Sequence, residues 1–374
     1  MNPRVMDATE ALQALRSFSA VIDVRSPSEF ALDHMPGAQN WPVLDDAQRA
    51  EVGTLYTQVD PFVANKRGAA LIARNIADHI EAHADALPKS WTPLVYCWRG
   101  GNRSGAMAHI LARVGFSVVL VQGGYRALRR ALRADLEQLP RQLQFHVLCG
   151  RTGCGKSRVL RALQLAGAQT LDLEAIAQHR GSVLGLEPGD EQPSQKLFES
   201  RLWAQLHRFD PQKPVFVEAE SKKIGLLHVP DSLMEQMRNS RCVSLELNPA
   251  LRVEFLLQDY AALAADRSLL QQRLDSLRAL RGAEVVKRWK DLIAQDDLRA
   301  FTADILEQHY DPSYLRSMTN NFQQFKSASR VQLDGIDEIA FARAAAQVLS
   351  LSVAVAPACP PLPRNQAQTE SSSC

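Results

Sequence analysis

The sequence predicts an α/β protein of two consecutive parallel-sheet domains, the second of which ends in a helical part. Its 374 residues exceed the usual size of one domain, and 46% of them are apolar, which is enough for two cores. Short β-branched runs alternate with longer segments of helical spacing in both halves. This alternation is typical of parallel sheets covered by helices, and the functional sites of such sheets lie beyond the carboxyl ends of the strands.

The first domain is predicted from short apolar runs that end in polar or glycine-rich loops. Three of them indicate strands, at residues 20–24, 93–96 and 117–122. The second run ends at Cys97, and residues 104–114 after it have helical length and spacing. A basic segment, 126–141, predicts a helix that closes this domain. We therefore place the first domain at residues 1–138.

The second domain repeats the alternation and then becomes helical. Four buried runs indicate its strands: residues 143–148, the short run that ends at Leu171, residues 214–217 and residues 242–247. Long helical patterns dominate from 251 to about 315. We place this domain at residues 142–350. Residues 355–374 are rich in Pro and Ser without periodicity, so a disordered tail is predicted there.

Charge and cysteine content exclude several classes of protein. Lys and Arg number 43 against 41 Asp and Glu, so any site for a polyanion must be a local patch. No stretch approaches the roughly 18 apolar residues of a membrane span, and the start of the chain has no leader pattern, so we expect a cytoplasmic protein without membrane contact. The six cysteines include no C-x-x-C pair, which argues against a disulfide framework or a zinc ribbon.

The segment after the 93–96 strand has the features of an anion-stabilising loop around a cysteine. It reads CWRGGNRS over residues 97–104 and leads into a helix. A helix N-terminus and nearby arginines favour a thiolate, so Cys97 is a candidate nucleophile. The candidate catalytic residues of this loop are Cys97, Arg99, Gly100, Gly101 and Arg103. The alternative is a buried structural cysteine.

Several motifs of the first domain resemble the rhodanese family of sulfurtransferases. They are DVRSPSEF at 23–30, HMPGAQN at 34–40 and GGY at 123–125, in the family's order. The resemblance implies that Cys97 carries a transferable chalcogen and that Asp23 and Arg25 serve the fold. Five residues separate Cys97 from Arg103, a spacing shared with rhodanese-like phosphatases, so a phosphatase stays an alternative at this point.

The second domain opens with a phosphate-binding loop. Residues 150–157, GRTGCGKS, match G-x-x-x-x-G-K-[ST] and lie between a strand and a helical pattern, as the motif requires. The candidate phosphate-binding residues are Gly150, Gly153, Gly155, Lys156 and Ser157. The Ser157 hydroxyl is a possible Mg²⁺ ligand, and no tightly bound cofactor is predicted.

Acidic residues at the ends of neighbouring strands are candidates for orienting a metal or an acceptor. Glu218 ends the 214–217 strand, and Asp172 follows Leu171. Glu174 could act with them. An exposed carboxylate at a strand end is the alternative for Glu218 and the simpler interpretation for Glu174. Cys149 and Cys154 flank the loop too closely for a zinc site, so we expect both to pack in the core.

Basic residues concentrate between the two loops. Residues 97–161 hold twelve Arg or Lys against two acids, in a nearly neutral chain. The candidates for binding nucleic-acid phosphates lie on the 126–141 helix: Arg126, Arg129, Arg130 and Arg133. A weaker basic group, at 287–290, includes Trp289, which we expect to pack in a helical core rather than stack on a base.

A rhodanese-like domain followed directly by a phosphate-loop domain resembles the bacterial tRNA 2-selenouridine synthases. Further stretches resemble that family as well: GTLY at 53–56, HRGS at 179–182, FESRL at 198–202, EAES at 218–221 and HYDP at 309–312. The C-x5-R loop with paired glycines is also the family's form. The resemblance implies a transferase that replaces sulfur by selenium in wobble 2-thiouridine of tRNA. Selenophosphate would be the donor, and geranyl diphosphate would supply an S-geranylated intermediate.

The partners expected from this resemblance are tRNA and an enzyme that supplies selenophosphate, and we expect a monomer. Two other functions remain open on the sequence alone. One is an ATP-dependent kinase or phosphatase with a regulatory rhodanese module. The other is a nucleotide-switched RNA-binding protein in which Cys97 senses redox state. The ligand of the phosphate loop and the role of residues 53–70 are not decided by the sequence.

Overall fold

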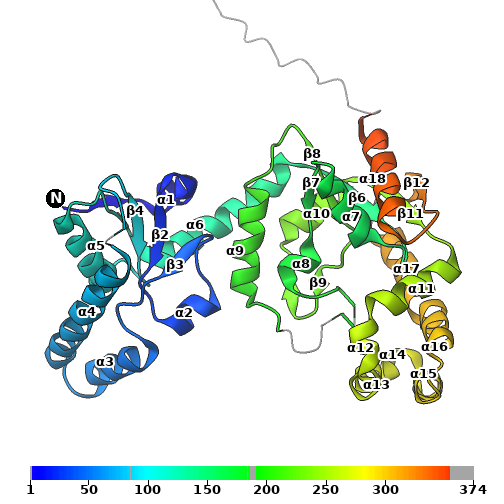
Figure 1. Ribbon diagram of the computed structural model, residues 1–374, viewed down its shortest axis with the longest axis horizontal. Helices are drawn as coiled ribbons and strands as arrows, with labels where there is room; N and C mark the ends of the chain where they lie inside the picture. Colours follow the sequence, from blue (N-terminus) through cyan, green and yellow to red (C-terminus); the bar gives the residue numbers. More distant parts are fainter. Residues whose placement is uncertain (1, 85, 183, 186–190, 354–374) are drawn as a thin grey trace, which may run out of the picture.

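The computed structural model describes residues 2–84, 86–182, 184–185 and 191–353. It shows two α/β domains joined by the long helix α6 (Gly124–Gln138), which runs from the first domain across to the second (Figure 1). Both sheets are entirely parallel, so the predicted fold class is confirmed. None of the helices in the described part of the chain is long and apolar enough to cross a membrane. The predicted tail, 355–374, lies outside the described residues.

The first domain is a five-stranded sheet of order β1-β5-β4-β2-β3. Its strands are β1 (Arg4–Met6), β2 (Ala20–Asp23), β3 (Ala38–Asn40), β4 (Pro93–Tyr96) and β5 (Val119–Val121). Its other helices are α1 (Ala8–Gln13), α2 (Pro27–Leu32), α3 (Asp46–Gln58), α4 (Pro61–His83) and α5 (Asn102–Val114). Apolar residues of α1 and α6 cover one face of the sheet, and those of α4 and α5 cover the other. Because both faces are covered, each central strand is apolar on both sides.

The second domain has a five-stranded sheet of order β12-β11-β6-β8-β7 and a small antiparallel hairpin. The strands are β6 (Gln144–Cys149), β7 (Gln169–Leu171), β8 (Pro214–Glu218), β11 (Arg241–Glu246) and β12 (Ser329–Gln332), with the hairpin β9 (Lys223–Ile224) and β10 (Leu227–His228). The helices around the sheet are α7 (Lys156–Leu165), α8 (Leu173–Ala177), α9 (Gln195–Leu206), α10 (Asp231–Asn239), α17 (Asp311–Asn321) and α18 (Glu338–Val353). Helices α7 and α18 pack on one face, while α9, α10 and α17 pack on the other.

A helical subdomain follows β11 and has its own core. It comprises α11 (Pro249–Asp259), α12 (Ala261–Ala265), α13 (Arg267–Leu274), α14 (Arg278–Arg281), α15 (Ala283–Ala294) and α16 (Leu298–Ile305). A π-helical turn, Leu306–Tyr310, connects α16 to α17. Trp289 is fully buried in this core and donates from Nε1 to Asp304 at 2.6 Å, which confirms that it packs rather than stacks on a base.

Several short strands and several helices were not predicted, among them strands β1, β3 and β12 and helices α3 and α4. Strand β1 extends the first sheet beside β5, and β12 extends the second beside β11. The unexplained segment 53–70 belongs to α3 and α4, which pack against each other. The predicted boundary near 140 falls between α6 and β6. Because α6 packs on both domains, the residue at which one domain ends stays a prediction.

Helix α6 and α9 form a polar junction between the domains. Arg129 donates to Ser200 Oγ at 3.0 Å and to the backbone oxygen of Lys196 at 3.1 Å, and it pairs with Glu199. Ser200 in turn donates to the buried Asp33 at 2.8 Å. The FESRL stretch, 198–202, therefore lies at this contact. We call these residues the interdomain junction: Asp33, Arg129, Glu199 and Ser200.

Candidate active sites

Cys97 lies at the carboxyl end of β4, where the segment 97–104 (the Cys97 loop) leads into α5. Its side chain is only 3% exposed, and the Ser104 hydroxyl donates to Sγ at 3.1 Å. Burial raises the pKa of the Cys97 thiol. Hydrogen bonds from the Ser104 hydroxyl and backbone, the Arg103 charge and the Arg99 backbone N–H outweigh it, so the pKa lies below its ordinary value. The loop therefore favours a thiolate.

The Cys97 loop is held by the first turn of α6. Tyr125 N–H donates to the Cys97 carbonyl at 2.7 Å. Gly100 and Gly124 both have positive φ, and a Cβ on Gly124 would collide with that same carbonyl oxygen. Gly101 has a negative φ and open space around its Cα, so of the glycine pair only Gly100 is required by the geometry.

The two arginines of the loop differ in role. Arg103 forms an ion pair with Glu29 at 2.9 Å, and its charge acts on the thiol. Arg99 is exposed, and it acts on the thiol through its backbone N–H. The expectation that both side-chain cations favour the thiolate is therefore correct only for Arg103. The predicted structural role of Arg25 is confirmed, because it is buried and donates from Nε to Asp23 at 2.9 Å.

A large groove opens beside the Cys97 loop. Its volume is about 1400 Å³, and its walls come from α3, α4 and the loop itself. The residues of segment 53–70 that line the groove are Gly53, Tyr56, Thr57, Ala64, Asn65, Gly68 and Ala69. Trp98 and Lys196 line it as well, which brings the second domain to the edge of the groove. Residues 53–70 therefore form a wall of this candidate site.

The phosphate loop, residues 150–157, connects β6 to α7 in the conformation that the motif predicts. Gly150, Gly153 and Gly155 all have positive φ, and a Cβ on Gly155 would meet the Phe341 ring at 2.6 Å. Lys156 Nζ donates to the Gly150 carbonyl at 3.0 Å, and Ser157 is exposed at the start of α7. A cavity of about 500 Å³ lies over the loop. Cys149 and Cys154 are buried and unpaired in the core, as expected.

The ion pair of Arg252 and Asp311 holds the phosphate loop in place. The buried Arg252 donates from Nε to the Thr152 carbonyl at 2.9 Å. It also pairs with Asp311 at 2.6 Å. Asp311 belongs to the HYDP stretch, which gives that resemblance a structural reason. No sequence pattern signals such a contact, because its partners are separated by many residues.

Three glutamates face the phosphate-loop cavity, and Asp172 does not. Glu174, Glu218 and Glu220 line the cavity. Burial and mutual repulsion raise the pKa of Glu174 and of Glu220. Burial also raises the pKa of Glu218, although the Lys156 charge acts in the opposite direction. Asp172 caps α8 by accepting from Ala175 N–H at 2.8 Å, and its charge also acts on the three glutamates, so its metal-orienting role stays a prediction.

The surroundings of Ser157 fit a magnesium ion in part. Glu218 lies beside the Ser157 hydroxyl, and its Oε1 is buried with no hydrogen-bond partner among the described residues. Oxygen donors of this kind suit Mg²⁺, which takes its remaining ligands from phosphates and water. Within the described ranges, no three His, Cys, Asp or Glu side chains are grouped to hold a metal by themselves. Any metal here would therefore depend on a bound phosphate.

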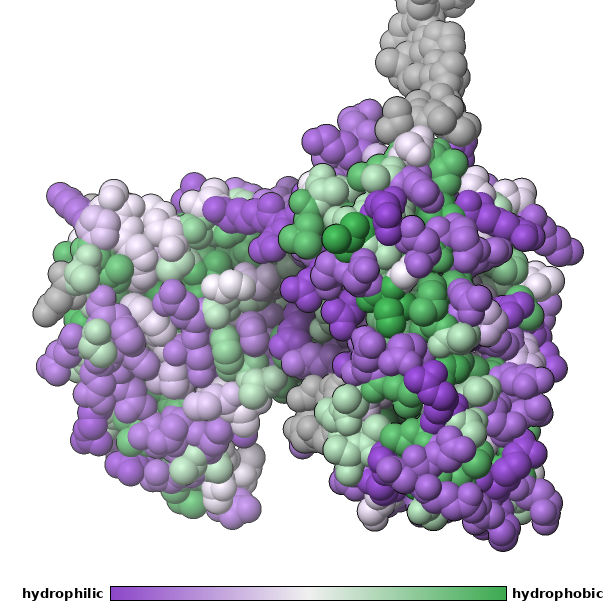
Figure 2. Space-filling model, turned by 45° about the vertical axis from the view of Figure 1, so that its right-hand side comes forward, coloured by the Kyte–Doolittle hydropathy of each residue, from purple (hydrophilic) through white to green (hydrophobic). Residues whose placement is uncertain are grey.

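The four arginines of α6 separate into two roles. Arg126, Arg130 and Arg133 are exposed and line a second cavity together with Trp98 and Lys196. Arg129 also lines this cavity but is only 9% exposed and is engaged in the interdomain junction, so its contact with nucleic-acid phosphate stays a prediction. The surface is hollowed between the two domains, and hydrophilic side chains lie in the hollow (Figure 2).

The basic residues of 287–290 are neutralised by their own subdomain. Lys287 pairs with Asp291, Arg288 with Asp304 and Lys290 with Asp275, at 2.6 to 2.7 Å. This surface therefore offers less positive charge to a polyanion than the exposed face of α6.

Comparisons with known proteins divide the chain in the same way. Residues 7–131 match the family model for the rhodanese-like domain, and residues 143–283 match the model for the tRNA 2-selenouridine synthase AAA domain. A tRNA 2-selenouridine synthase of Alcanivorax borkumensis is 36% identical over 68% of this chain and 70% of its own. That of Psychromonas ingrahamii is 31% identical over 84% of this chain and 90% of its own. A rhodanese-related protein from Thermoplasma volcanium is 19% identical, with a TM-score of 0.23, over 34% of this chain and 91% of that one.

Proposed function

Because the chain belongs to the tRNA 2-selenouridine synthase family, we propose that it is a transferase that replaces sulfur by selenium in wobble 2-thiouridine of tRNA. The proposed route uses selenophosphate as donor and an S-geranylated intermediate made from geranyl diphosphate. The observation that carries it is the presence of two different anion-stabilising loops on one chain. The Cys97 loop favours a thiolate beside an open groove, and the phosphate loop lies under a separate cavity.

The first step is assigned to the phosphate loop. The sulfur of the thiouridine attacks C1 of geranyl diphosphate, the C–O bond breaks, and inorganic diphosphate leaves. Loop N–H groups, the N-terminus of α7 and Lys156 stabilise the leaving charge. A bound Mg²⁺ would be held by Ser157 and Glu218 and would neutralise further charge on the diphosphate. Raised pKa values keep protons on neighbouring carboxyl groups, which reduces repulsion of an anionic ligand.

The second step is assigned to the Cys97 loop. Prenylation converts the sulfur into a good leaving group, and the bond from the base to sulfur is replaced by a bond to selenium. Geranyl thiol departs, and water takes the phosphoryl group of selenophosphate, so no oxidant or reductant is needed. In this exchange the Cys97 thiolate attacks the base carbon and displaces geranyl thiol, and the selenide freed from selenophosphate then displaces Cys97, which is regenerated as the thiolate. The 1400 Å³ groove has room for a nucleobase.

The tRNA is assigned to the exposed face of α6. Arg126, Arg130 and Arg133 are spaced along one face of the helix, close to Trp98 of the Cys97 loop. Such a row suits contacts to the phosphate backbone, which position a nucleic acid without reading its sequence. We assign the supply of selenophosphate to another enzyme.

The test is a reaction of the purified protein with tRNA that contains 2-thiouridine, followed by mass spectrometry of the nucleosides. Wild type with geranyl diphosphate and selenophosphate should yield 2-selenouridine. Cys97→Ser should yield S-geranyl-2-thiouridine and no selenouridine, because only the exchange needs the thiolate. Selenouridine at the wild-type level in this variant would remove Cys97 from the mechanism.

The same experiment separates the alternatives. ATP hydrolysis without a modified nucleoside would support a kinase or phosphatase. Binding of tRNA that depends on nucleotide and on the oxidation state of Cys97, without any product, would support a redox-sensing RNA-binding protein.

A further inference from the structure

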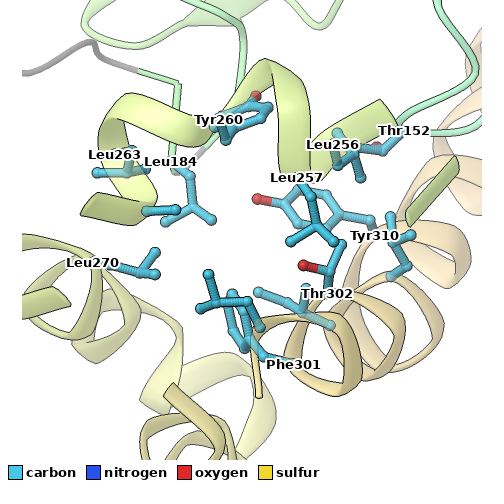
Figure 3. Close-up of a pocket in the computed structure, with 14 residues that line it drawn as sticks. Thr152, Leu184, Leu256, Leu257, Tyr260, Leu263, Leu270, Phe301, Thr302 and Tyr310 are labelled. Carbon is cyan, nitrogen blue, oxygen red and sulfur yellow. The ribbon is translucent and has the colours of Figure 1, made fainter. Parts of the chain in front are cut away.

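An apolar pocket lies beside the phosphate loop, inside the helical subdomain. It is lined by side chains of α11, α12, α13 and α16, by the π-helical turn and by Leu184 (Figure 3). The apolar side chains labelled in Figure 3 are Leu184, Leu256, Leu257, Leu263, Leu270 and Phe301. Its volume is about 60 Å³, more than a single water molecule needs, and its apolar lining suits a hydrocarbon group.

This pocket adjoins the cavity over the phosphate loop, since the two share lining residues. Thr152, Leu256, Tyr260 and Tyr310 line both. Thr152 is itself a residue of the phosphate loop, and its carbonyl is fixed by Arg252. Figure 3 shows Thr152 and Leu256 at one side of the pocket and Leu263 and Leu270 at the other. A ligand could therefore extend from the loop into apolar surroundings without leaving the protein.

The two adjoining cavities differ in chemistry. At the loop end, backbone N–H groups, Lys156 and Ser157 suit an anionic head. At the other end, Leu263, Leu270 and Phe301 offer no charged group. The π-helical turn lies between them and presents Tyr310 to both cavities. The combination selects a molecule with a diphosphate at one end and a hydrocarbon chain at the other.

We propose that this pocket binds the hydrocarbon chain of the prenyl diphosphate and that Leu270 limits the length of chain accepted. The proposal rests on the proposed function, which requires a prenyl donor at the phosphate loop. The diphosphate lies on residues 150–157, and the chain runs past Leu256 and Tyr310 toward Leu270. Each methylene buried in an apolar site strengthens binding by roughly fourfold, so the pocket favours longer chains until Leu270 stops them.

The test compares two substitutions at Leu270 with one at Leu274. Leu270→Ala lengthens the pocket and Leu270→Phe shortens it. Leu274→Ala is the matched control, since Leu274 is a fully buried leucine of the same helix and the same core but does not line the pocket. Calorimetric affinities are measured for dimethylallyl, geranyl and farnesyl diphosphate and for inorganic diphosphate.

Leu270→Ala should raise the affinity for farnesyl diphosphate relative to geranyl diphosphate by roughly tenfold. Leu270→Phe should lower the affinity for geranyl diphosphate relative to dimethylallyl diphosphate by a similar factor. Inorganic diphosphate should bind all variants equally. Because the readout is a ratio within each variant, a loss of stability common to Leu270→Ala and Leu274→Ala does not affect it.

Two outcomes overturn the proposal, and they are distinguishable. If wild type binds geranyl diphosphate no better than inorganic diphosphate, no chain is bound anywhere and the proposed prenyl donor fails as well. If wild type prefers geranyl diphosphate but the preference among chains is unchanged in both Leu270 variants, the chain lies elsewhere, and the proposed function survives without this pocket.

Discussion

At the scale of single residues, Ser104 controls how readily Cys97 ionises. Its hydroxyl and its backbone N–H both donate to the sulfur, whereas the Arg99 side chain is exposed. Hydrogen bonds to the charged form lower a pKa, and burial without them raises it. The chemistry of the nucleophile therefore depends more on a serine of α5 than on the nearer arginine.

We expect Ser104→Ala to raise the pKa of Cys97, because the buried thiolate loses a donor. The pH dependence of Cys97 alkylation, resolved by peptide mass spectrometry, should shift to higher pH. Arg99→Ala is the control and should leave the profile in place, since the backbone N–H remains. If the alkylation profile shifts in Arg99→Ala and stays in place in Ser104→Ala, the arginine and not the serine sets the pKa of Cys97.

At the phosphate loop, Lys156 is the residue that we expect to stabilise the charge of the leaving diphosphate. Lys156→Ala should reduce geranyl transfer by roughly 10²- to 10³-fold, because the variant has no cation to stabilise the leaving diphosphate. Arg161→Ala removes one exposed positive charge from the same helix, away from the loop, and should leave the rate unchanged. The measurement is the rate of S-geranyl-2-thiouridine formation by wild type and both variants. Unchanged transfer together with abolished nucleotide binding would favour a kinase.

The sequence was sufficient to locate the loops that a local pattern defines. Cys97, Arg103 and the phosphate loop are examples, since each is defined by its neighbours in the chain. Glu29 and Arg252 could not be found in this way, because they meet Arg103 and Thr152 only after the chain has folded. The part of Arg129 in the interdomain junction could not be found for the same reason, since its acidic partner lies 70 residues further along the chain.

At the scale of elements, the two faces of α6 have different tasks. Its buried face carries Leu128, Leu132 and Leu136, and its exposed face carries Arg126, Arg130 and Arg133. The helical spacing was visible in the sequence, but which arginines face the solvent depends on where α9 packs. Strands β1 and β12 escaped prediction because they are short edge strands, whose few residues give little periodicity.

We expect the double substitution Arg126→Ala, Arg130→Ala to weaken the binding of cognate and non-cognate tRNA about equally. The slope of log K against log salt should flatten by roughly 0.7 to 0.9 for each phosphate that no longer has an arginine beside it. The control is Lys287→Ala, Arg288→Ala, whose charges are already paired within the subdomain. An unchanged slope in the α6 variant would place the tRNA on another surface.

At the scale of the whole molecule, the two domains share one core. A single buried cluster includes Met6 and Leu12 from the first domain, Leu132 from α6, and Phe198 and Leu202 from the second. The interdomain junction adds hydrogen bonds, and Trp203 donates to Asp135 at 2.7 Å. The motifs predicted two domains in order, but nothing in their patterns indicated that the joining helix would be common to both cores.

We expect Arg129→Ala to lower the free energy of unfolding by about 3 to 5 kcal/mol, because Asp33 and Glu199 lose a buried partner. Calorimetry should show one transition for wild type and a broadened or divided one for the variant. Arg126→Ala, on the exposed face of the same helix, should leave the Tm nearly unchanged. A single sharp transition at the wild-type Tm in Arg129→Ala would show that the junction contributes little.

The shared helix has a practical consequence for anyone who cuts this chain into parts. A cut after α6 leaves the first fragment with the apolar face of α6 that α9 and α10 cover in the intact chain. A cut before α6 removes Tyr125, whose N–H holds the Cys97 carbonyl, and uncovers the sheet beneath. Each fragment would expose an apolar surface that the intact chain buries, so separately expressed halves should aggregate. If both halves are co-expressed and both contain α6, the two copies of α6 can compete for the same binding surface.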